Sequence, residues 1–319
     1  MGAVDACHAA DTAAAATMGR SSKEVGMRFG IVTPVVNLNP RFDPPTWERD
    51  GGIDDVVAVA QAAERFGYGW VSCPEHVAIP TAVAATRGAR YWDPLATLSY
   101  VAASTSAIGL LSHVTVLGYH HPLELVKRWG TLDVISGGRV LLGVGVGSLA
   151  EEFALLGADF DRRGPIADEA LAAIGAAWGR PSPAFHGEHF SFDGMVVDPA
   201  GVPGHLQLWV GGRTRRSLRR ALTFGHGWIP FGCTLDGLAD LLADPDVAAL
   251  REARTDPFEV VLAPEPPLDP AGDPAGTAAT LDAYAAVGAT ALAVRFRHRS
   301  RQHYVEQLEA LRTVSDAAR

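Results

Sequence analysis

Apolar and polar positions show two kinds of pattern along the chain, one typical of helices and one typical of strands. In residues 122–136 apolar side chains recur every three or four positions, which predicts an amphipathic helix beginning at Pro122. A Gly137-Gly138 pair ends it, because glycine readily adopts the positive φ of a helix C-terminus. Residues 140–147 (VLLGVGVG) are apolar without alternation, as is typical of a parallel strand covered on both faces. The segment therefore predicts one helix–strand unit of an α/β fold.

The same succession of strands and helices extends over the rest of the chain. Strands are predicted at residues 27–35, 69–73, 108–117, 140–147, 207–210, 228–231, 258–263 and 291–296. Helices are predicted at residues 53–66, 94–105, 122–136, 166–178, 214–224, 235–254 (with a break at Pro245), 277–287 and 301–318. An alternating stretch at 185–197, with Asp193-Gly194 as its turn, predicts a β-hairpin inserted before the fifth strand. We expect a single (β/α)8 TIM barrel, the α/β architecture in which strands and helices alternate.

Length, charge and cysteine content limit the classes of protein to which the chain can belong. We expect one barrel domain at residues 27–319. Residues 1–26 are rich in Ala, Ser and Thr and do not resemble a signal peptide, so we expect a disordered extension or a start codon placed too early. No apolar run approaches the roughly 18 residues of a membrane helix, and the net charge of −9 argues against nucleic acid as a partner. Three cysteines (Cys7, Cys73 and Cys233) are too few for a disulfide framework and favour a reducing cytoplasm.

Polar residues at the C-terminal ends of the strands are the candidates for chemistry, because barrels of this kind hold their active sites there. Glu75 and His76 directly follow the second strand. An imidazole, with an ordinary pKa of roughly 6.5, can donate or accept a proton during a reaction. The alternative is a histidine that bonds to backbone and packs on the barrel rim.

The segment Gly211-Gly212-Arg213-Thr214 lies between the fifth strand and its helix. Two glycines let backbone N–H groups approach an oxyanion, and the helix N-terminus adds positive partial charge. Arginines also crowd this helix start, where they oppose the helix dipole (Arg213, Arg215, Arg216, Arg219 and Arg220). Their placement favours an anion-binding site; a tight strand–helix turn is the alternative.

An ordered series of phrases resembles the bacterial-luciferase-like superfamily, and most closely its branch that uses the deazaflavin coenzyme F420. The phrases are MRFGI at the first strand, the acid–His pair Glu75-His76, TLDVISGGRVLLGVGVG at 131–147, EEFALLG at 151–157, RRGPIADEAL at 162–171, FHGEHFSFDG at 185–194 and LWVGG at 208–212. The resemblance implies a barrel that holds F420, or less favourably FMN, with the ring over the third strand and the phosphate near the fifth.

The same resemblance implies roles for individual residues. Glu75 and His76 would be catalytic beside the ring. The cofactor would contact the residues Ser112, His113, Gly145, Gly147, Ser148, Gly211, Gly212, Arg213 and Thr214. A cis peptide, common in F420 proteins at this place, is predicted at Ser112–His113. Relatives often have Thr-Gly there, so the imidazole of His113 either contacts ring or substrate or blocks the cofactor. Ser148 stands where sugar-phosphate dehydrogenases of this group carry glutamate, which disfavours that substrate.

Three functions compete. The first is an F420-dependent oxidoreductase acting on a small organic substrate; the second is an FMN-dependent monooxygenase supplied by a partner reductase; the third is a cofactor-binding homologue without turnover. Alternating arginines near the last strand (Arg295, Arg297, Arg299 and Arg301) would share one side if extended and would suit the polyanionic tail of F420 or an anionic substrate. Pairing with nearby acidic residues is the alternative. A metal hydrolase is disfavoured because the first strand ends in Thr33-Pro34-Val35 without metal ligands, and His186 and His189 fall in the hairpin. We expect no metal and no membrane partner, and we allow for a homodimer.

Overall fold

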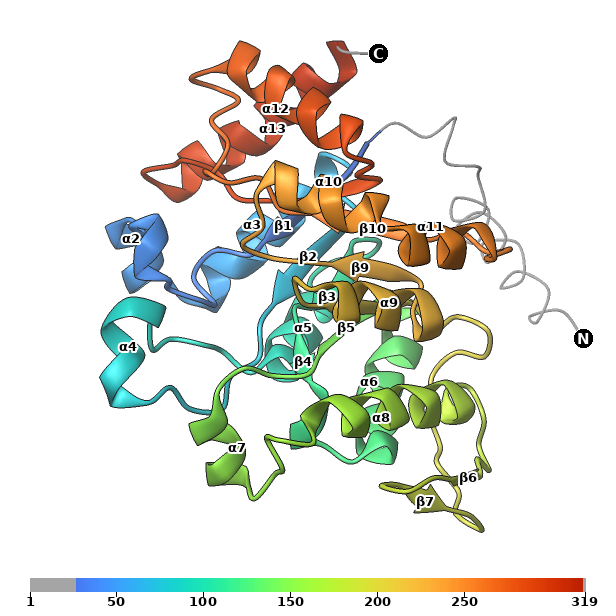
Figure 1. Ribbon diagram of the computed structural model, residues 1–319. Helices are drawn as coiled ribbons and strands as arrows, with labels where there is room; N and C mark the ends of the chain where they lie inside the picture. The colour runs from blue at the N-terminus through green and yellow to red at the C-terminus, as the bar shows by residue number, and fades with distance from the viewer. Residues whose placement is uncertain (1–26, 318–319) are drawn as a thin grey trace, which may run out of the picture.

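Parallel strands close into a barrel in the computed structural model, which describes residues 27–317 (Figure 1). They are β1 (Arg28–Val32), β2 (Trp70–Cys73), β3 (Gly109–Ser112), β4 (Thr115–Val116), β5 (Val140–Gly145), β8 (Leu208–Gly211), β9 (Gly227–Ile229), β10 (Glu259–Leu262) and β11 (Ala291–Val294). β1 pairs with β2 on one side and β11 on the other, and β3 and β4 both pair with β5, which closes the ring. Because β3 and β4 are two segments of one barrel strand, the barrel has eight strand positions. The predicted (β/α)8 TIM barrel is confirmed.

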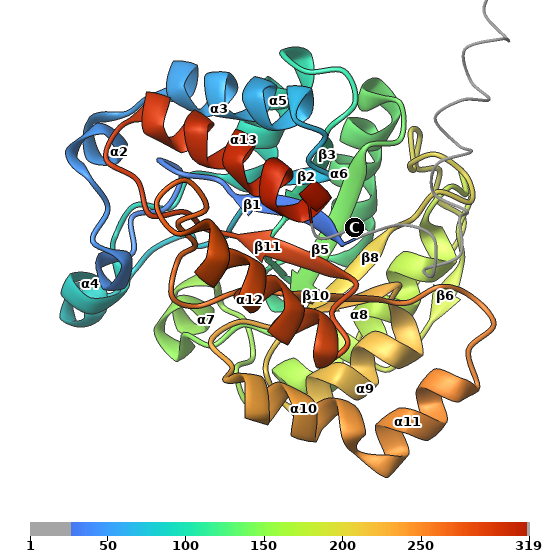
Figure 2. The same cartoon turned by 90° about the horizontal axis from the view of Figure 1, so that it is seen from above.

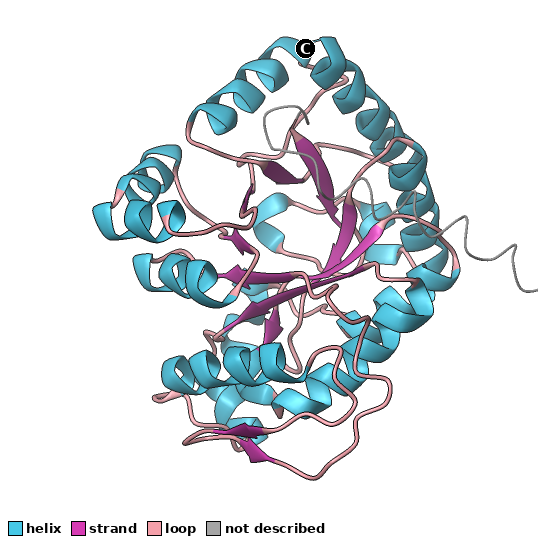
Figure 3. Cartoon of the chain, turned by 90° about the vertical axis from the view of Figure 1, so that its right-hand side faces the viewer, coloured by secondary structure: helices cyan, strands magenta, loops and turns pink. Residues whose placement is uncertain are grey.

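Helices surround the strands on the outside (Figures 2 and 3). The outer layer contains α3 (Ile53–Arg65), α5 (Pro94–Ala103), α6 (Pro122–Ser136), α8 (Arg163–Ala177), α9 (Arg215–Phe224), α10 (Leu235–Ala243), α11 (Pro245–Glu252), α12 (Pro274–Ala286) and α13 (Arg301–Ala317). Shorter helices lie in the loops after β1, β2, β4 and β5: η1 (Pro40–Phe42), α2 (Thr46–Asp50), α4 (Thr81–Arg87), η2 (Leu117–Tyr119) and α7 (Ala150–Leu156). Of these, α2, α4 and α7 gather on the left of Figure 1, at the C-terminal end of the barrel.

The barrel interior is packed with large side chains. Trp70, Leu111, Leu141 and Trp209 belong to one buried cluster, whereas their neighbours along each strand join the cluster beneath the helices, as alternation requires. The indoles of Trp70 and Trp209 meet edge to face, with centroids 5.1 Å apart. Gly30 is needed beside them, because a Cβ there would lie 1.9 Å from the Trp70 ring. These side chains fill the barrel interior, so a ligand of the barrel is expected at its C-terminal end.

Two local predictions were wrong. The third strand breaks at a cis peptide between His113 and Val114, one residue after the predicted Ser112–His113 bond. Ser112 itself stays in β3, where it pairs with Cys73 of β2 and donates its hydroxyl to the carbonyl oxygen of Gly143 at 2.8 Å.

The second error concerns the segment before β8. There β6 (Phe185–His186) pairs antiparallel with β7 (Ser191–Phe192), so the chain turns at 187–190 and not at Asp193-Gly194. The side chain of Glu169 in α8 accepts hydrogen bonds from the N–H groups of Glu188, His189 and Phe190, and this carboxylate fixes the turn.

The remaining predictions concern the loop helices, the break at Pro245, the N-terminal segment and membrane spans. Helices α4 and α7 were not predicted, since both loops read as polar and irregular. The predicted break at Pro245 is confirmed, because this residue begins α11. The disordered extension predicted for residues 1–26 lies outside the described residues. Within residues 27–317, the helices are too short or too polar to cross a bilayer.

Candidate active site

His76, immediately beyond β2, is held by a buried carboxylate from α7. Glu152 Oε2 lies 2.7 Å from His76 Nδ1 and accepts a hydrogen bond from the Tyr119 hydroxyl at 2.8 Å. Glu152 Oε1 accepts from the N–H groups of Val77 at 2.6 Å and Ala78 at 3.1 Å. With four donors around it and only 1% of its surface exposed, Glu152 joins α7 to the loop after β2. Sequence reasoning had given it no role.

The protonation of this pair follows from its surroundings. Burial alone would raise the pKa of Glu152, but the hydrogen bonds from His76, Ala78 and Tyr119 lower it below its ordinary value. Glu152 is therefore a carboxylate, and Nδ1 of His76 must carry a hydrogen to donate to it. Nε2 of His76 has no hydrogen-bond partner among residues 27–317. The ring, whose side chain is 19% exposed, rests edge-on against Tyr91 with centroids 4.5 Å apart. This geometry leaves one nitrogen available to a reacting molecule.

Glu75, the other predicted catalytic residue, faces a different set of partners. Its Oε2 accepts from the N–H of Val116 at 2.6 Å, and its Oε1 lies 2.9 Å from Nε2 of His120. Burial would lower the pKa of His120, but Glu75, and to a lesser degree Glu124, raise it overall. Glu75 thus ties the end of β2 to β4 and η2, and its contacts are those of a residue that positions the backbone around His76.

His113 sits where the third strand breaks. Burial, and secondarily the nearby charge of Arg295, lowers the pKa of its imidazole to about 4, so the ring is neutral near pH 7. Its backbone N–H donates to the carbonyl of Cys73 at 2.9 Å. Ser112, predicted to contact a cofactor, is fully buried with its hydroxyl already committed to Gly143. Of this predicted pair, only His113 retains a free polar group.

The glycines at the ends of β5 and β8 make room for Val114. A Cβ on Gly145 would lie 2.7 Å from Val114 Cγ2, and one on Gly211 would lie 2.9 Å from Val114 Cγ1. Gly147 has a φ of 79°, and a Cβ there would meet the Phe153 ring at 2.5 Å. These close approaches explain why the positions are glycine. Ser148 beyond them is exposed, and its hydroxyl accepts from Arg87 Nη2 at 3.4 Å.

The turn between β8 and α9 is shaped by the helix cap. Gly212 has a φ of 109°, a backbone angle that residues with a side chain rarely adopt. Thr214 is the N-cap of α9: its Oγ1 accepts from Ser217 N at 3.2 Å, and Ser217 Oγ accepts from Thr214 N at 3.0 Å. The Thr214 hydroxyl is therefore engaged in the cap. The turn lies where the sequence predicts it, and the reciprocal cap with Ser217 has no recognisable signal in the sequence because serine replaces the usual Glu or Gln.

Only part of the arginine cluster at this turn is available to a ligand. Arg215 pairs with Asp244 at 2.9 Å and with Asp246, and Arg220 pairs with Asp168. Arg213 and Arg216 are exposed and have no side-chain hydrogen bond or ion pair within residues 27–317. These two remain candidates for an anion.

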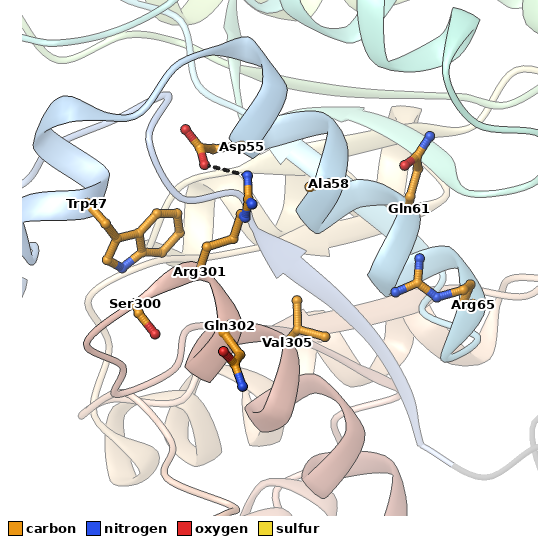
Figure 4. Close-up of a pocket in the computed structure, with 9 residues that line it drawn as sticks. All are labelled: Trp47, Asp55, Ala58, Gln61, Arg65, Ser300, Arg301, Gln302 and Val305. Carbon is orange, nitrogen blue, oxygen red and sulfur yellow. Dashed lines mark hydrogen bonds and ion pairs between the residues drawn. The ribbon is translucent and has the colours of Figure 1, made fainter.

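The arginines near the last strand do not form one row, contrary to prediction. The reason is that β11 ends at Val294 and α13 begins at Arg301, so the segment does not stay extended. Arg301 turns to the outer wall and bonds to Asp55 of α3 at 2.9 Å, in an open groove between α3 and α13 (Figure 4). Arg295 and Arg297 instead line a cavity at the barrel mouth.

Metal and thiol chemistry find no support in the described region. Residues 27–317 hold no group of three or more His, Cys, Asp or Glu side chains arranged to bind a metal ion. Burial raises the pKa of the Cys73 thiol to about 12, so it is not a thiolate at neutral pH. Cys233 is partly exposed, and burial likewise raises its pKa.

The fold and this site define a (β/α)8 barrel whose mouth is lined with histidine, tyrosine and arginine side chains. The chain belongs to the luciferase-like monooxygenase family, whose model matches residues 27–318. The uncharacterised protein Rv0953c of Mycobacterium tuberculosis (strain ATCC 25618 / H37Rv) is 32% identical over 218 residues, which cover 64% of this chain and 77% of the relative. An F420-dependent hydroxymycolic acid dehydrogenase from the same organism is 29% identical over 188 residues, 55% of this chain and 48% of that protein. The solved EDTA monooxygenase (EmoA) of Chelativorans sp. BNC1 has the same fold, with a TM-score of 0.73, 12% identity and coverage of 92% of this chain and 94% of that one.

Proposed function

We propose that the chain is an oxidoreductase that transfers a hydride between coenzyme F420 and a small organic substrate. The observation that carries this proposal is the fixed imidazole of His76 at the barrel mouth, with Nδ1 bound to the Glu152 carboxylate at 2.7 Å and Nε2 without a partner among residues 27–317. A histidine held in one tautomer is suited to give or take a proton as a hydride leaves or arrives. Membership of a flavin- and F420-using family supports the same reading.

The residues present fit an anionic cofactor. Arg213 and Arg216 are exposed and unpaired within the described region. They follow Gly212, where a Cβ would lie 2.8 Å from Ser217 Cβ in the first turn of α9. They would hold the phosphate, where the first turn of α9 adds positive partial charge. When bound, F420 supplies the hydride-carrying ring, and the protein supplies binding and orientation.

Each residue of the site has a definable task in this proposal. Glu152 keeps Nδ1 of His76 protonated, so a neutral His76 offers Nε2 as a proton acceptor, and a charged one offers it as a donor. Glu75 holds β4 and η2 against the end of β2. His113, neutral near pH 7, adds a polar group without charge beside Arg295. Ser112, whose hydroxyl is committed to Gly143, has no part in it.

The rival function is an FMN-dependent monooxygenase, and the family's own name favours keeping it. The two cofactors differ in charge, because F420 ends in an oligoglutamate tail and FMN ends at its phosphate. Fluorescence titration of F420 beside FMN separates them. We expect tighter binding of F420, weakened several-fold in Arg213→Gln/Arg216→Gln and unchanged in Arg251→Gln, an exposed arginine on α11. Binding should also weaken with salt, since exposed charges are screened beyond about 10 Å at 0.1 M. Tighter binding of FMN, or equal F420 affinity in both variants and wild type, would refute the assignment.

Three further expectations rest on sequence and family alone. They are a cytoplasmic location, a reductase that supplies reduced F420 or flavin, and a homodimer. Size-exclusion chromatography with light scattering tests the last of these directly.

A further inference from the structure

A cavity of about 400 Å³ lies at the barrel mouth, between the loop after β1 and the segment after β11. Its apolar walls include Val32, Phe42 and Phe296. Its polar lining includes Asn37, Asn39, Arg295 and Tyr304. A cavity of this size accommodates a small organic molecule. The outer groove of Figure 4 is far more open and lies outside the barrel.

Arg295 brings a positive charge without a direct partner to this cavity. Its side chain is half-buried and makes no hydrogen bond or ion pair with the described residues; its one specific contact is with the Phe42 ring, 4.5 Å from the centroid. Burial lowers the pKa of Arg295, and nearby Tyr304 and Glu48 oppose that effect. A guanidinium remains protonated in proteins, so five N–H donors stand in or beside the cavity.

The carboxylates nearest to Arg295 are committed to other donors. Glu48 Oε2 accepts from Val35 N at 3.1 Å, and its Oε1 lies 3.1 Å from His298 Nε2. Because Trp47 Nε1 donates to His298 Nδ1 at 3.1 Å, His298 carries its hydrogen on Nε2 and donates it to Glu48.

Glu265 is likewise paired, with Arg41 at 2.6 Å. The lining arginines (Arg41, Arg295 and Arg297) are therefore matched in number by the acids Asp43, Glu48 and Glu265. What sets Arg295 apart is that it makes no ion pair with any of the three, because Glu48 and Glu265 are engaged elsewhere.

Tyr304 adds a second unused donor. The residue is 1% exposed and lines the cavity, yet its hydroxyl has no hydrogen-bond partner in the described part of the chain. Burial, and then Glu48, raises its pKa, so the phenol stays protonated and can donate. A buried hydroxyl without a partner lowers the stability of the protein, and a ligand that accepts its hydrogen bond would remove that cost.

From this pairing we infer that the cavity binds the carboxylate of the substrate, between the guanidinium of Arg295 and the hydroxyl of Tyr304. Guanidinium and carboxylate match in planar geometry, and the phenol donates to a remaining lone pair. The aromatic walls then hold an apolar body. Asn37 of the lining pairs with Tyr91, whose ring contacts His76, so two residues connect the cavity to the candidate acid–base group. The inference deepens the proposed function by naming its substrate class: small organic acids.

The same chemistry could be satisfied by the glutamate tail of F420, and the cavity argues for the substrate. Its Arg295 is half-buried and its Tyr304 hydroxyl is buried, whereas Arg213 and Arg216 offer a tail exposed charges on the far side of the mouth, after β8. A concave site with apolar walls selects a compact anion with an apolar body over a long, hydrated chain.

The test uses cofactor-free protein, benzoate and its neutral analogue benzamide in isothermal titration calorimetry. We expect wild type to bind benzoate at least tenfold more tightly than benzamide, and Arg295→Gln to lose that preference. Tyr304→Phe should weaken benzoate binding about 3- to 10-fold, the contribution of one hydrogen bond. It should not lower the melting temperature, since the hydroxyl makes no hydrogen bond within residues 27–317. Arg251→Gln and Tyr100→Phe, both exposed, serve as matched controls and should bind as wild type.

Three results would overturn the inference. These are no binding of benzoate to folded wild type, equal binding by wild type and both cavity variants, or a loss of long-tailed F420 affinity in Arg295→Gln while benzoate affinity is unchanged. Failure of wild type to bind F420 would refute the proposed function instead, and the benzoate result would still stand.

Discussion

Replacing Glu152 by glutamine changes the hydrogen-bond pattern around His76 with almost no change in shape. The carboxylate accepts from four donors: His76 Nδ1, Val77 N, Ala78 N and the Tyr119 hydroxyl. An amide has one accepting oxygen. If that oxygen keeps the two backbone N–H groups, the amide NH2 faces His76 and donates to Nδ1. The imidazole must then move its hydrogen to Nε2, so the nitrogen that wild type leaves free as an acceptor becomes a donor.

The size of the effect follows from the same contacts. Hydrogen bonds to a charged group contribute about 1.5–3 kcal/mol and neutral ones about 0.5–1.5 kcal/mol, so losing the charge at a site with four donors should cost about 2–4 kcal/mol of unfolding free energy. The hydrogen bonds lower the pKa of Glu152, so its contribution is present above the ordinary pKa of 4.5 and is lost as the pH falls through the lower folded value. The stability difference between wild type and Glu152→Gln should therefore be largest near pH 7 and shrink in acid.

Two measurements check this. Long-range ¹H–¹⁵N NMR reports which nitrogen of His76 carries the hydrogen, with His76→Ala identifying the signal. Urea unfolding at several pH values gives the stability difference. Glu151→Gln, the exposed neighbour in α7, is the matched control and should resemble wild type. An unchanged tautomer in Glu152→Gln, or a stability equal to that of Glu151→Gln, would show that Glu152 does not orient His76. With an identified substrate, the wrong tautomer of His76 in Glu152→Gln should lower kcat about 10²–10⁴-fold.

Three shorter predictions concern other residues of the site. His76→Ala should lower turnover about 10²–10⁴-fold while leaving F420 affinity within about threefold, as titration and steady-state kinetics would measure; a loss under tenfold in turnover argues for a packing role. Gly212→Ala should reduce the unfolding free energy by about 1–3 kcal/mol, because φ is 109° and the new Cβ would lie 2.8 Å from Ser217 Cβ; unchanged urea unfolding would contradict that backbone. With its pKa lowered to about 4, His113 stays neutral in the folded chain while the unfolded chain takes up a proton, so wild-type stability should fall as pH drops from 6.5 towards 4. His113→Gln should have a flatter profile over that range in the same denaturation series.

The sequence alone determined the elements and their succession. Residues 140–147 predicted a buried strand, and β5 occupies Val140–Gly145. Pro122 and Gly137 predicted the ends of a helix, and α6 begins at Pro122 and is capped by Gly137 at a φ of 72°. These features are local: periodic burial and the backbone preferences of proline and glycine act within a few residues. The acid–His pair was also visible, since the end of a barrel strand is a defined place in the fold.

Tertiary structure decided which side chains meet. Glu152 and His76 are 76 positions apart, and only the folding of α7 over the loop after β2 brings them to 2.7 Å. The phrase EEFALLG matched the family, yet nothing in it distinguishes buried Glu152 from exposed Glu151 until that contact is formed. Likewise Arg295 and Arg301 look equivalent in a row of alternating arginines. Arg295 directly follows β11 and lies at the barrel mouth, whereas Arg301 begins α13 and lies on the outer wall. Periodicity specifies the face of an element, whereas a site depends on how barrel closure and its loops bring several elements together.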